Sequence, residues 1–297
     1  MLKVWITAFR LRTLPLALAS IGMGAFLAVA DGFFSWPIFT WCAITTVGLQ
    51  ILSNLANDYG DTVNGADSVE RSGPARTVQA GLISLPNMRK AIIIFIMITL
   101  LSGTYLLYLA FGFKWEAFLF FFAVGIAAIL AAIAYTAGRK PYGYMGLGDI
   151  SVLLFFGFVA VLGSYYLFAE SIYPDLLLPA ASIGLFSTGV LNVNNIRDIE
   201  SDLKAGKFSI PARIGRSKAV VYHWILLSVG LILSVFYVLN NYDSPWQFLF
   251  LLVLPLLIRN GLAVKTKKSA KDLDPFLKQL ALTSLLFVLL FGLGQLF

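Results

Sequence analysis

Two acidic segments combine asparagine and aspartate at helical spacing in a chain that is otherwise largely apolar. Their members are Asn54, Asp58 and Asp61 in the first segment and Asn194, Asp198 and Asp202 in the second. Residues three, four, seven or eight positions apart share one face of a helix, so each set is expected to form a stack. Mg²⁺ is usually held by one or two carboxylates together with water and substrate phosphates. Two facing stacks therefore predict a divalent-metal site that holds a diphosphate.

The candidate metal ligands and catalytic residues are the four aspartates of the stacks, Asp58, Asp61, Asp198 and Asp202. Asp67 is a further acidic candidate, and Asn54 and Asn194 could orient the carboxylates or donate hydrogen bonds to phosphate oxygens. The alternative is that these acids cap helices or pair with nearby arginines. Carboxylates are costly near a bilayer, and their recurrence at two matching positions favours a functional site.

Basic residues follow each acidic segment and could complete a site for an anion. Arg71 and Arg76 follow the first segment, Lys207 and Arg213 follow the second, and Lys140 comes after a later apolar run. Guanidinium and ammonium groups neutralise the charge of a diphosphate leaving group. For each of them the competing explanation is the positive charge that membrane proteins concentrate in their cytoplasmic loops.

Residues 135–149 form a segment rich in glycine and tyrosine. The glycines permit unusual backbone turns close to a ligand. Tyr135, Tyr142 and Tyr144 could present their rings to a carbocation, which is a cation–π role. Asp149 starts the next apolar run, where it either caps the helix or contacts an acceptor substrate.

Composition identifies the class of protein. Of 297 residues, 59% are hydrophobic and only 12% are charged, with a mean hydropathy of +0.84. Soluble domains carry about 25% charged residues, so the chain is predicted to be a polytopic membrane protein. The single cysteine, Cys42, and the single histidine, His223, argue against a cysteine zinc site and a Ser-His-Asp triad, and His223 is expected to be interfacial. The net charge of +7 is better explained by the positive-inside rule than by nucleic-acid binding.

Windows of about 20 apolar residues give nine candidate spans. They lie near residues 11–30, 37–56, 90–111, 117–136, 149–168, 176–195, 219–239, 247–264 and 277–297. Among the 22 lysines and arginines, Lys114 alone falls in the short connectors at one end of these spans. This asymmetry predicts that the N-terminus and the long loops, with both acidic segments, are cytoplasmic.

The chain is expected to form a single domain, residues 1–297, in which all nine helices make one all-α bundle. Both acidic segments end a span, and four spans separate the first of these from the second, so parallel internal repeats around a central cavity are predicted. Residues 80–87 and 206–218 are expected to form cytoplasmic cap loops. The stretch Lys265–Lys278 is expected to be a solvated connector facing lipid headgroups.

These motifs resemble, in order and along essentially the whole chain, those of the UbiA-type membrane prenyltransferases of quinone biosynthesis. The segment from Asn57 to Asp67 reads NDYGDTVNGAD and is similar to the first acidic motif of the branch that prenylates 1,4-dihydroxy-2-naphthoate. The segment from Asn194 to Lys207 reads NNIRDIESDLKAGK and is similar to the second. The runs LRTLP at residues 11–15 and PYGYMGLGD at residues 141–149 add to the resemblance.

Spacing within the first motif distinguishes two branches of the family. Enzymes that act on 4-hydroxybenzoate typically have a third acidic residue four positions after the one equivalent to Asp61. This chain has Gly65 at that position, and its next acid is Asp67. The resemblance therefore favours the naphthoate branch.

The resemblance implies Mg²⁺-dependent electrophilic aromatic prenylation in the cell membrane, with polyprenyl diphosphate and 1,4-dihydroxy-2-naphthoate as substrates. The allylic C–O bond ionises, the ring is attacked at the carbon that carries the carboxylate, and loss of CO₂ gives demethylmenaquinol for menaquinone biosynthesis. The expected substrate-binding residues are Asn54, Asn57, Asp67, Arg71, Arg76, Tyr135, Lys140, Asp149, Asn194 and Lys207.

Three alternatives stay open on the sequence alone. The first keeps the family but changes the acceptor to 4-hydroxybenzoate or another ring. The second is a secondary transporter that uses the acids for ion coupling, although transporter sites usually lie near the bilayer midplane. The third is a lipid-binding structural protein, which would give no reason for paired aspartate stacks.

Overall fold

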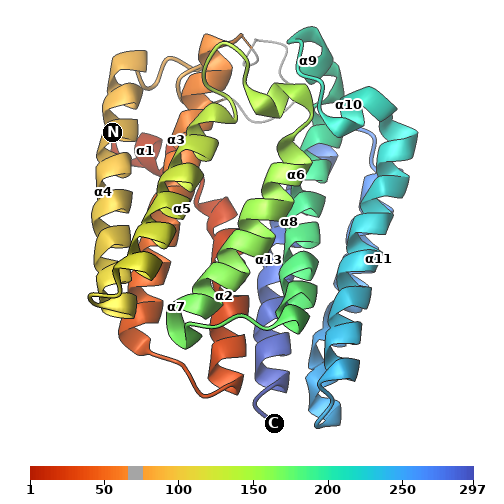
Figure 1. Ribbon diagram of the computed structural model, residues 1–297. Coiled ribbons are helices and arrows are strands. Elements are labelled where there is room, and N and C mark those ends of the chain that lie inside the picture. The colour runs from red at the N-terminus through yellow and green to blue at the C-terminus, as the bar shows by residue number, and fades with distance from the viewer. Residues whose placement is uncertain (66–75) are drawn as a thin grey trace.

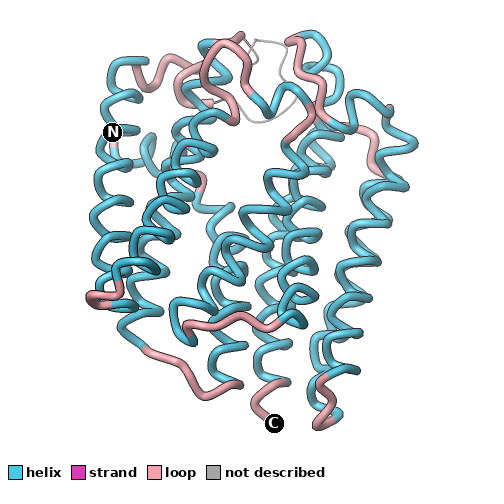
Figure 2. The backbone as a smooth tube through the Cα atoms, viewed as in Figure 1, coloured by secondary structure: helices cyan, strands magenta, loops and turns pink. Residues whose placement is uncertain are grey.

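The computed structural model describes residues 1–65 and 76–297, and within these ranges the chain is helical, with no strand (Figure 2). Nine helical segments of the described chain are long and apolar enough to cross a membrane, as predicted. They are Leu2–Ala30, Trp36–Val63, Leu85–Phe111, Trp115–Ala134, Gly148–Ala169, Pro174–Arg197, Arg216–Asn240, Pro245–Thr266 and Ala270–Gly294.

Several spans are assembled from more than one helical element. The spans that are single helices are α3 (Trp36–Val63), α4 (Leu85–Phe111), α5 (Trp115–Ala134), α11 (Arg216–Asn240) and α13 (Ala270–Gly294). The composite spans are α1 (Leu2–Phe9) with η1 (Leu11–Thr13) and α2 (Leu14–Ala30); α6 (Gly148–Val152) with η3 (Leu153–Leu162) and α7 (Gly163–Ala169); η4 (Pro174–Leu176) with α8 (Leu177–Arg197); and η5 (Pro245–Val253) with α12 (Leu254–Thr266). Shorter helices are η2 (Tyr142–Met145), α9 (Ile199–Lys204) and α10 (Ile210–Ile214).

The spans stand side by side as one bundle, and the two ends of the bundle differ (Figure 1). The helices α9 and α10 gather at one end, and the C-terminus lies at the other end. Within the bundle α8 is the central helix, since 67% of its apolar window is buried, against 6% for α5. The helix that carries the second acidic motif is therefore packed within the bundle, whereas α5 lies at the periphery and contributes one wall of the cavity described below.

Close contact between η3 and α8 fixes the central helix. A Cβ placed on Gly157 of η3 would lie 2.7 Å from the Ala180 carbonyl oxygen and 2.9 Å from the Gly184 Cα atom. Small residues at such crossings allow two backbones to approach, and van der Waals packing then stabilises helix association inside a membrane. The pair Gly157 and Gly184 thus sets the distance at which α8 crosses the fifth span.

Several helix boundaries differ from those expected, and the differences affect the site. The second span continues through Val63, so Asp58 and Asp61 lie within the last turns of α3. The last span begins at Ala270 rather than near residue 277, so part of the expected lipid-facing connector Lys265–Lys278 belongs to α13. The hydrophobic pattern missed these turns because they are polar, although they are helical.

The second acidic stack is not one continuous helix. α8 ends at Arg197, and Asp198 has non-helical angles (φ −102°, ψ 11°) before α9 begins at Ile199. Backbone bonds from Asp198 to Asn194 and from Asp202 to Asp198 nevertheless keep the four-residue spacing across the break. The break reorients α9 while Asn194, Asp198 and Asp202 stay near one another.

The expectation for His223 was wrong. Its side chain is fully buried in the bundle, where Nε2 lies 2.9 Å from Asn260 Oδ1. Asn260 in turn donates to the Phe276 carbonyl oxygen and to Gln279 Oε1. This polar network joins α11, α12 and α13, because a polar side chain inside the bundle must find a partner on a neighbouring helix.

Replacing Gly157 with alanine should destabilise the bundle. The added methyl group has no space against the Ala180 carbonyl oxygen, and overpacking of this kind costs about 1–3 kcal/mol. Gly125→Ala on α5 is the matched control, since nothing lies within 4 Å of its Cβ position. Thermal unfolding of the purified protein should show a lower Tm for Gly157→Ala only, and equal Tm values would contradict the tight crossing.

Candidate active site

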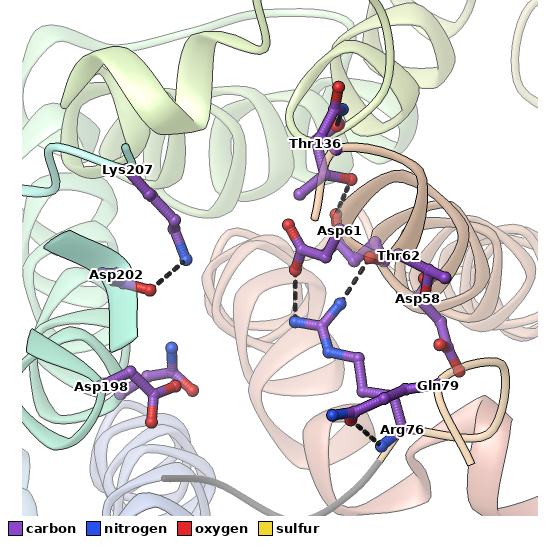
Figure 3. Close-up of polar contacts among 12 residues, drawn as sticks. Asp58, Asp61, Thr62, Arg76, Gln79, Thr136, Asp198, Asp202 and Lys207 are labelled. Carbon is purple, nitrogen blue, oxygen red and sulfur yellow. Dashed lines mark hydrogen bonds and ion pairs between the residues drawn. The ribbon is translucent and has the colours of Figure 1, made fainter. Parts of the chain in front are cut away.

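Two groups of acidic side chains face each other at one end of the bundle (Figure 3). Asp61 comes from the end of α3, and Asp198 and Asp202 come from the α8–α9 junction. All three side chains are nearly buried. Arg76 and Lys207 point toward the space between the two groups. The structure therefore brings the two acidic motifs together, as their repetition in the sequence predicted.

Asp61 is the member of the first motif that faces the second. Its Oδ2 atom lies 2.5 Å from Arg76 Nη2, and its Oδ1 atom accepts a hydrogen bond from the Tyr144 hydroxyl at 2.7 Å. Arg76 also donates to the Asn57 carbonyl oxygen, so the guanidinium is fixed between the end of α3 and Asp61. Charge-assisted contacts of this kind are stronger than neutral ones and orient both groups.

Asp58, the other aspartate of this motif, points away from Asp202 (Figure 3). Its Oδ2 atom accepts from the Thr77 hydroxyl at 2.6 Å and from the Thr77 backbone N–H at 3.2 Å, and its Oδ1 atom accepts from the Val78 N–H at 3.4 Å. Asp58 thereby holds the turn that follows Arg76. Positions 58 and 61 are about 60° apart on a helix, which is enough to give the two carboxylates different surroundings.

Arg197 holds Asp198 in the second motif. The Nε and Nη2 atoms of Arg197 each donate to a different oxygen of Asp198 at 2.7 Å, which is a bidentate arrangement. Its remaining Nη1 donates to Asp274 of α13 at 2.6 Å, and Asn194 Oδ1 accepts from Nη2 at 2.9 Å. Arg12 donates to the second oxygen of Asp274 at 3.1 Å. A chain of alternating charges thus links η1, α13 and the second motif.

Asp202 pairs with Lys207, which lies just beyond α9. The Lys207 Nζ atom lies 3.3 Å from Asp202 Oδ1, and Ser209 Oγ lies 3.5 Å from Oδ2. Burial raises the pKa of Asp202 to about 6; Lys207 opposes this rise, and the negative charges of Asp198 and Asp61 add to it. Asp202 therefore shares one electrostatic environment with both other acids, and a bound cation would favour its ionised form.

Tyr144 connects the two motifs, a role that the sequence interpretation did not give it. Its hydroxyl donates to Asp61, its carbonyl oxygen accepts from the Phe208 N–H at 2.9 Å, and its ring lies 6.0 Å from Lys207 Nζ. Arg213 reinforces the link by donating to the carbonyl oxygens of Phe208 and Met145. The segment of residues 135–149 thus joins the two acidic groups through the hydrogen bonds of Tyr144.

Tyr135 stands where an apolar cavity meets the acidic groups. Its ring packs against two glycines, since a Cβ on Gly143 or Gly148 would lie 3.0 Å or less from its atoms. Burial raises the pKa of Tyr135, and the negative charges of Asp61, Asp149 and Asp202 raise it further, so its hydroxyl stays protonated. The glycines of this segment are needed to seat an aromatic ring beside the acids.

The cavity has a volume of about 400 Å³ and is enclosed mainly by α2, α3, α4, α5 and the fifth span. Its exposed wall surface is largely aliphatic and aromatic, and its polar side chains include Asn54, Asn57, Tyr135, Tyr142 and Ser151. Asn57 Oδ1 accepts from the Thr136 hydroxyl at 3.1 Å, which joins the end of α3 to the segment after α5. An apolar chamber with polar side chains at the end near the acidic groups suits an amphiphilic substrate.

The other predicted site residues that the structure describes either contact other parts of the bundle or are exposed. Asn54 donates to the Phe9 carbonyl oxygen and to Thr13 Oγ1, both at 2.9 Å, and so attaches the N-terminal elements to α3. Asp149 is buried and accepts from the Tyr222 hydroxyl at 3.0 Å, whereas Lys140 is exposed. Asp67 and Arg71 lie outside the described residues.

The facing acids of the described residues do not form a closed metal cage. Among residues 1–65 and 76–297 there is no cluster of three or more His, Cys, Asp or Glu side chains able to hold a metal. Buried carboxylate oxygens with basic side chains between them nevertheless fit a metal that is completed by water and phosphate oxygens, as is usual for Mg²⁺. Asp61 lies on one side of the space between the acidic groups, and Asp198 and Asp202 lie on the other.

The fold and the site define a membrane-embedded helical protein with facing acidic motifs at the end of an apolar cavity. The chain belongs to the UbiA prenyltransferase family, whose model matches residues 17–291. It is 46% identical over 99% of its length, and 96% of the relative, to the 1,4-dihydroxy-2-naphthoate octaprenyltransferase of Haemophilus influenzae. It is 44% identical to the protein of that name from Escherichia coli, over 98% of this chain and 94% of the relative. The predicted family is confirmed.

Solved structures agree with this fold. A UbiA homolog from Aeropyrum pernix superposes with a TM-score of 0.69 at 17% identity, covering 95% of this chain and 96% of that one. A UbiA homolog from Archaeoglobus fulgidus, solved bound to DMAPP and Mg²⁺, gives a TM-score of 0.61 at 17% identity, covering 96% of this chain and 98% of that one. The helical bundle is therefore shared despite low sequence identity.

Asp58→Asn should lower stability rather than remove a ligand of the site. An asparagine amide presents one acceptor oxygen, so a donor of Thr77 or Val78 would face an NH₂ group, at a cost of about 1–3 kcal/mol. We expect a lower Tm in thermal unfolding. Asp243→Asn, in an exposed connector, is the control. An unchanged Tm for Asp58→Asn together with lost magnesium binding would instead make Asp58 a ligand.

Proposed function

We propose that this protein transfers a polyprenyl group from polyprenyl diphosphate to 1,4-dihydroxy-2-naphthoate, releasing diphosphate and CO₂ and forming demethylmenaquinol. The observation that carries the proposal is the pair of facing acidic groups, each with its basic partner, beside the Tyr135 end of an apolar cavity. The names of relatives that are 46% and 44% identical over nearly the whole chain support the choice of reaction.

The acidic and basic side chains would hold the diphosphate. Asp61, Asp198 and Asp202 would bind Mg²⁺, which would neutralise the charge that develops on the leaving group. Arg76 and Lys207 lie close enough to these acids to donate to the same diphosphate oxygens. Preorganised charges of this kind stabilise the transition state of bond ionisation, because they need no reorganisation when the charge develops.

The cavity and its tyrosine would protect the reacting carbon. The polyprenyl tail packs against aliphatic and aromatic walls, where each buried CH₂ contributes about 0.8 kcal/mol. The ring of Tyr135 stands beside the acidic groups and can face an allylic cation. Exclusion of water from this end of the cavity favours attack by the aromatic acceptor over hydrolysis.

The reaction needs no covalent intermediate between the substrate and the protein. The allylic C–O bond breaks, and its electron pair leaves with the diphosphate. A C–C bond forms at the ring carbon that carries the carboxylate. The bond to that carboxylate then breaks, CO₂ departs, and the electron pair restores the aromatic ring. The side chains bind and orient the substrates and stabilise the developing charge. The single histidine, His223, is buried against Asn260 and takes no part in this step.

The conformation at the end of α3 supports 1,4-dihydroxy-2-naphthoate over 4-hydroxybenzoate as the acceptor substrate. Gly65 has φ +76°, a left-handed conformation that glycine adopts at helix C-termini without strain. The helix therefore stops where hydroxybenzoate enzymes typically carry their third acidic residue. Supplying each acceptor with one polyprenyl diphosphate should give a decarboxylated naphthoate product by mass spectrometry. A product formed from 4-hydroxybenzoate alone would exclude the proposed acceptor.

The same end of the bundle is proposed to face the cytoplasm, where both substrates' polar groups are available. Of the short connectors at the opposite end, only that around Lys114 contains a lysine or arginine. Nine helical spans among the described residues bring the N-terminus and the C-terminus to opposite ends of the bundle (Figure 1). Positive charge is enriched in cytoplasmic loops, which supports this orientation in a cell membrane.

Asp61→Asn and Asp202→Asn should each reduce prenyl transfer by at least about 10²-fold, because each removes a carboxylate from the proposed Mg²⁺–diphosphate site. Product formation by membranes with added Mg²⁺ measures the loss, and chelation by EDTA should abolish the wild-type reaction. Asp272→Asn, exposed at the start of α13, should keep normal activity. Full activity in either site variant would defeat the proposed role of the acids.

A further inference from the structure

Every facing carboxylate of the site has a basic partner that contacts at least one of its oxygens. Arg76 contacts Asp61, Arg197 contacts Asp198, and Lys207 contacts Asp202. In these three ion pairs of the described residues, each negative side chain therefore faces a positive one. A metal ion that binds one of these oxygens must compete with the cation already beside it, and a diphosphate must compete with the carboxylates for the same cations.

The basic partners differ in how firmly they are held. Arg197 has a side chain only 1% exposed, contacts both oxygens of Asp198, and is anchored a second time by Asp274. The Lys207 Nζ atom lies 3.3 Å from Asp202 Oδ1, which is long for a charged pair, and 6.0 Å from the centre of the neutral Tyr144 ring. Arg197 is thus a fixed orienting group, whereas Lys207 can turn without breaking a second ion pair.

We propose that Lys207 is an exchangeable counter-ion: it neutralises Asp202 and moves its ammonium group onto the diphosphate when that oxygen of Asp202 binds magnesium. This inference rests on the proposed function and specifies how its site is loaded. Lys207 points from the α9–α10 segment toward the space between the two acidic groups, so a rotation of its flexible stem suffices (Figure 3). Repulsion between an ammonium group and a nearby divalent cation favours the move, and the diphosphate oxygens accept the released donor.

The exchange predicts that magnesium and diphosphate bind cooperatively. Magnesium alone must displace Lys207 from Asp202 without giving the lysine a new partner. Diphosphate alone must draw Lys207 away and leave a buried carboxylate unneutralised, which is costly. When both arrive, each charge acquires a partner of opposite sign. Coupling of this kind is reciprocal, so each ligand should raise the affinity for the other by the same factor.

Removing the lysine charge should therefore affect the two ligands in opposite directions. In Lys207→Gln, magnesium alone should bind about three- to tenfold more tightly than in the wild type, because its competitor for Asp202 is gone. Magnesium with inorganic pyrophosphate should bind about tenfold more weakly or worse, because a donor to the diphosphate is lost. Calorimetric titrations of the purified full chain with Mg²⁺, and with pyrophosphate at fixed Mg²⁺, measure both affinities.

Two further variants serve as controls for charge and folding. Lys218→Gln removes the same charge from an exposed position at the start of α11 and should leave both affinities unchanged. Lys207→Arg keeps a cation and should preserve the coupling between the two ligands. If each variant unfolds with the same Tm as the wild type, any change in affinity is local to the substituted side chain.

The outcomes separate this inference from the function on which it rests. Opposite shifts in Lys207→Gln, with coupling intact in Lys207→Arg, support the exchange. Equal weakening of both ligands, or no change in the binding of Mg²⁺ alone, overturns it while leaving a diphosphate site in place. Absence of pyrophosphate binding by the wild type at any Mg²⁺ concentration would instead overturn the proposed site itself.

Discussion

The balance of charge between the two acidic groups is the constraint on which this structure depends. Asp61, Asp198 and Asp202 are nearly buried at the end of a membrane bundle, and a buried carboxylate without a partner is strongly destabilising. Each therefore has a cationic side chain within ion-pair distance. In the proposed function, two of these cations, Arg76 and Lys207, also donate to the diphosphate. The ion pairs of the site and the proposed ligand binding therefore use one set of side chains.

Satisfying this balance requires segments from most of the chain. The turn fixed by Asp58 delivers Arg76 to Asp61, and the loop that contains Tyr144 connects Asp61 to the backbone beside Lys207. Asp274, on the last helix, secures Arg197 from outside the acidic group. The apolar spans supply a rigid frame, because their crossings are close and their polar residues pair internally. The site is consequently a property of the whole bundle.

The sequence predicted the class, the nine spans and the meeting of the two acidic motifs, because hydropathy and helical spacing are local signals. It did not distinguish Asp58 from Asp61, since periodicity gives positions on a helix but not what each position faces. Nor did it reveal the pairing of Arg197 with Asp274, which are 77 residues apart. His223 was misplaced for the same reason: only the neighbouring helix supplies Asn260 as its partner.

The two acidic motifs reach the same electrostatic arrangement by different backbone routes. α3 runs unbroken through Asp58 and Asp61 and ends before Gly65, whereas α8 breaks at Asp198 and restarts as α9. In both, a basic residue from the following segment pairs with an aspartate of the motif, Arg76 with Asp61 and Lys207 with Asp202. The equivalence of the halves therefore lies in charge pairing rather than in helix geometry. Because the pairing partner comes from the loop, changes in loop sequence can retune each half without disturbing the helices that carry the acids.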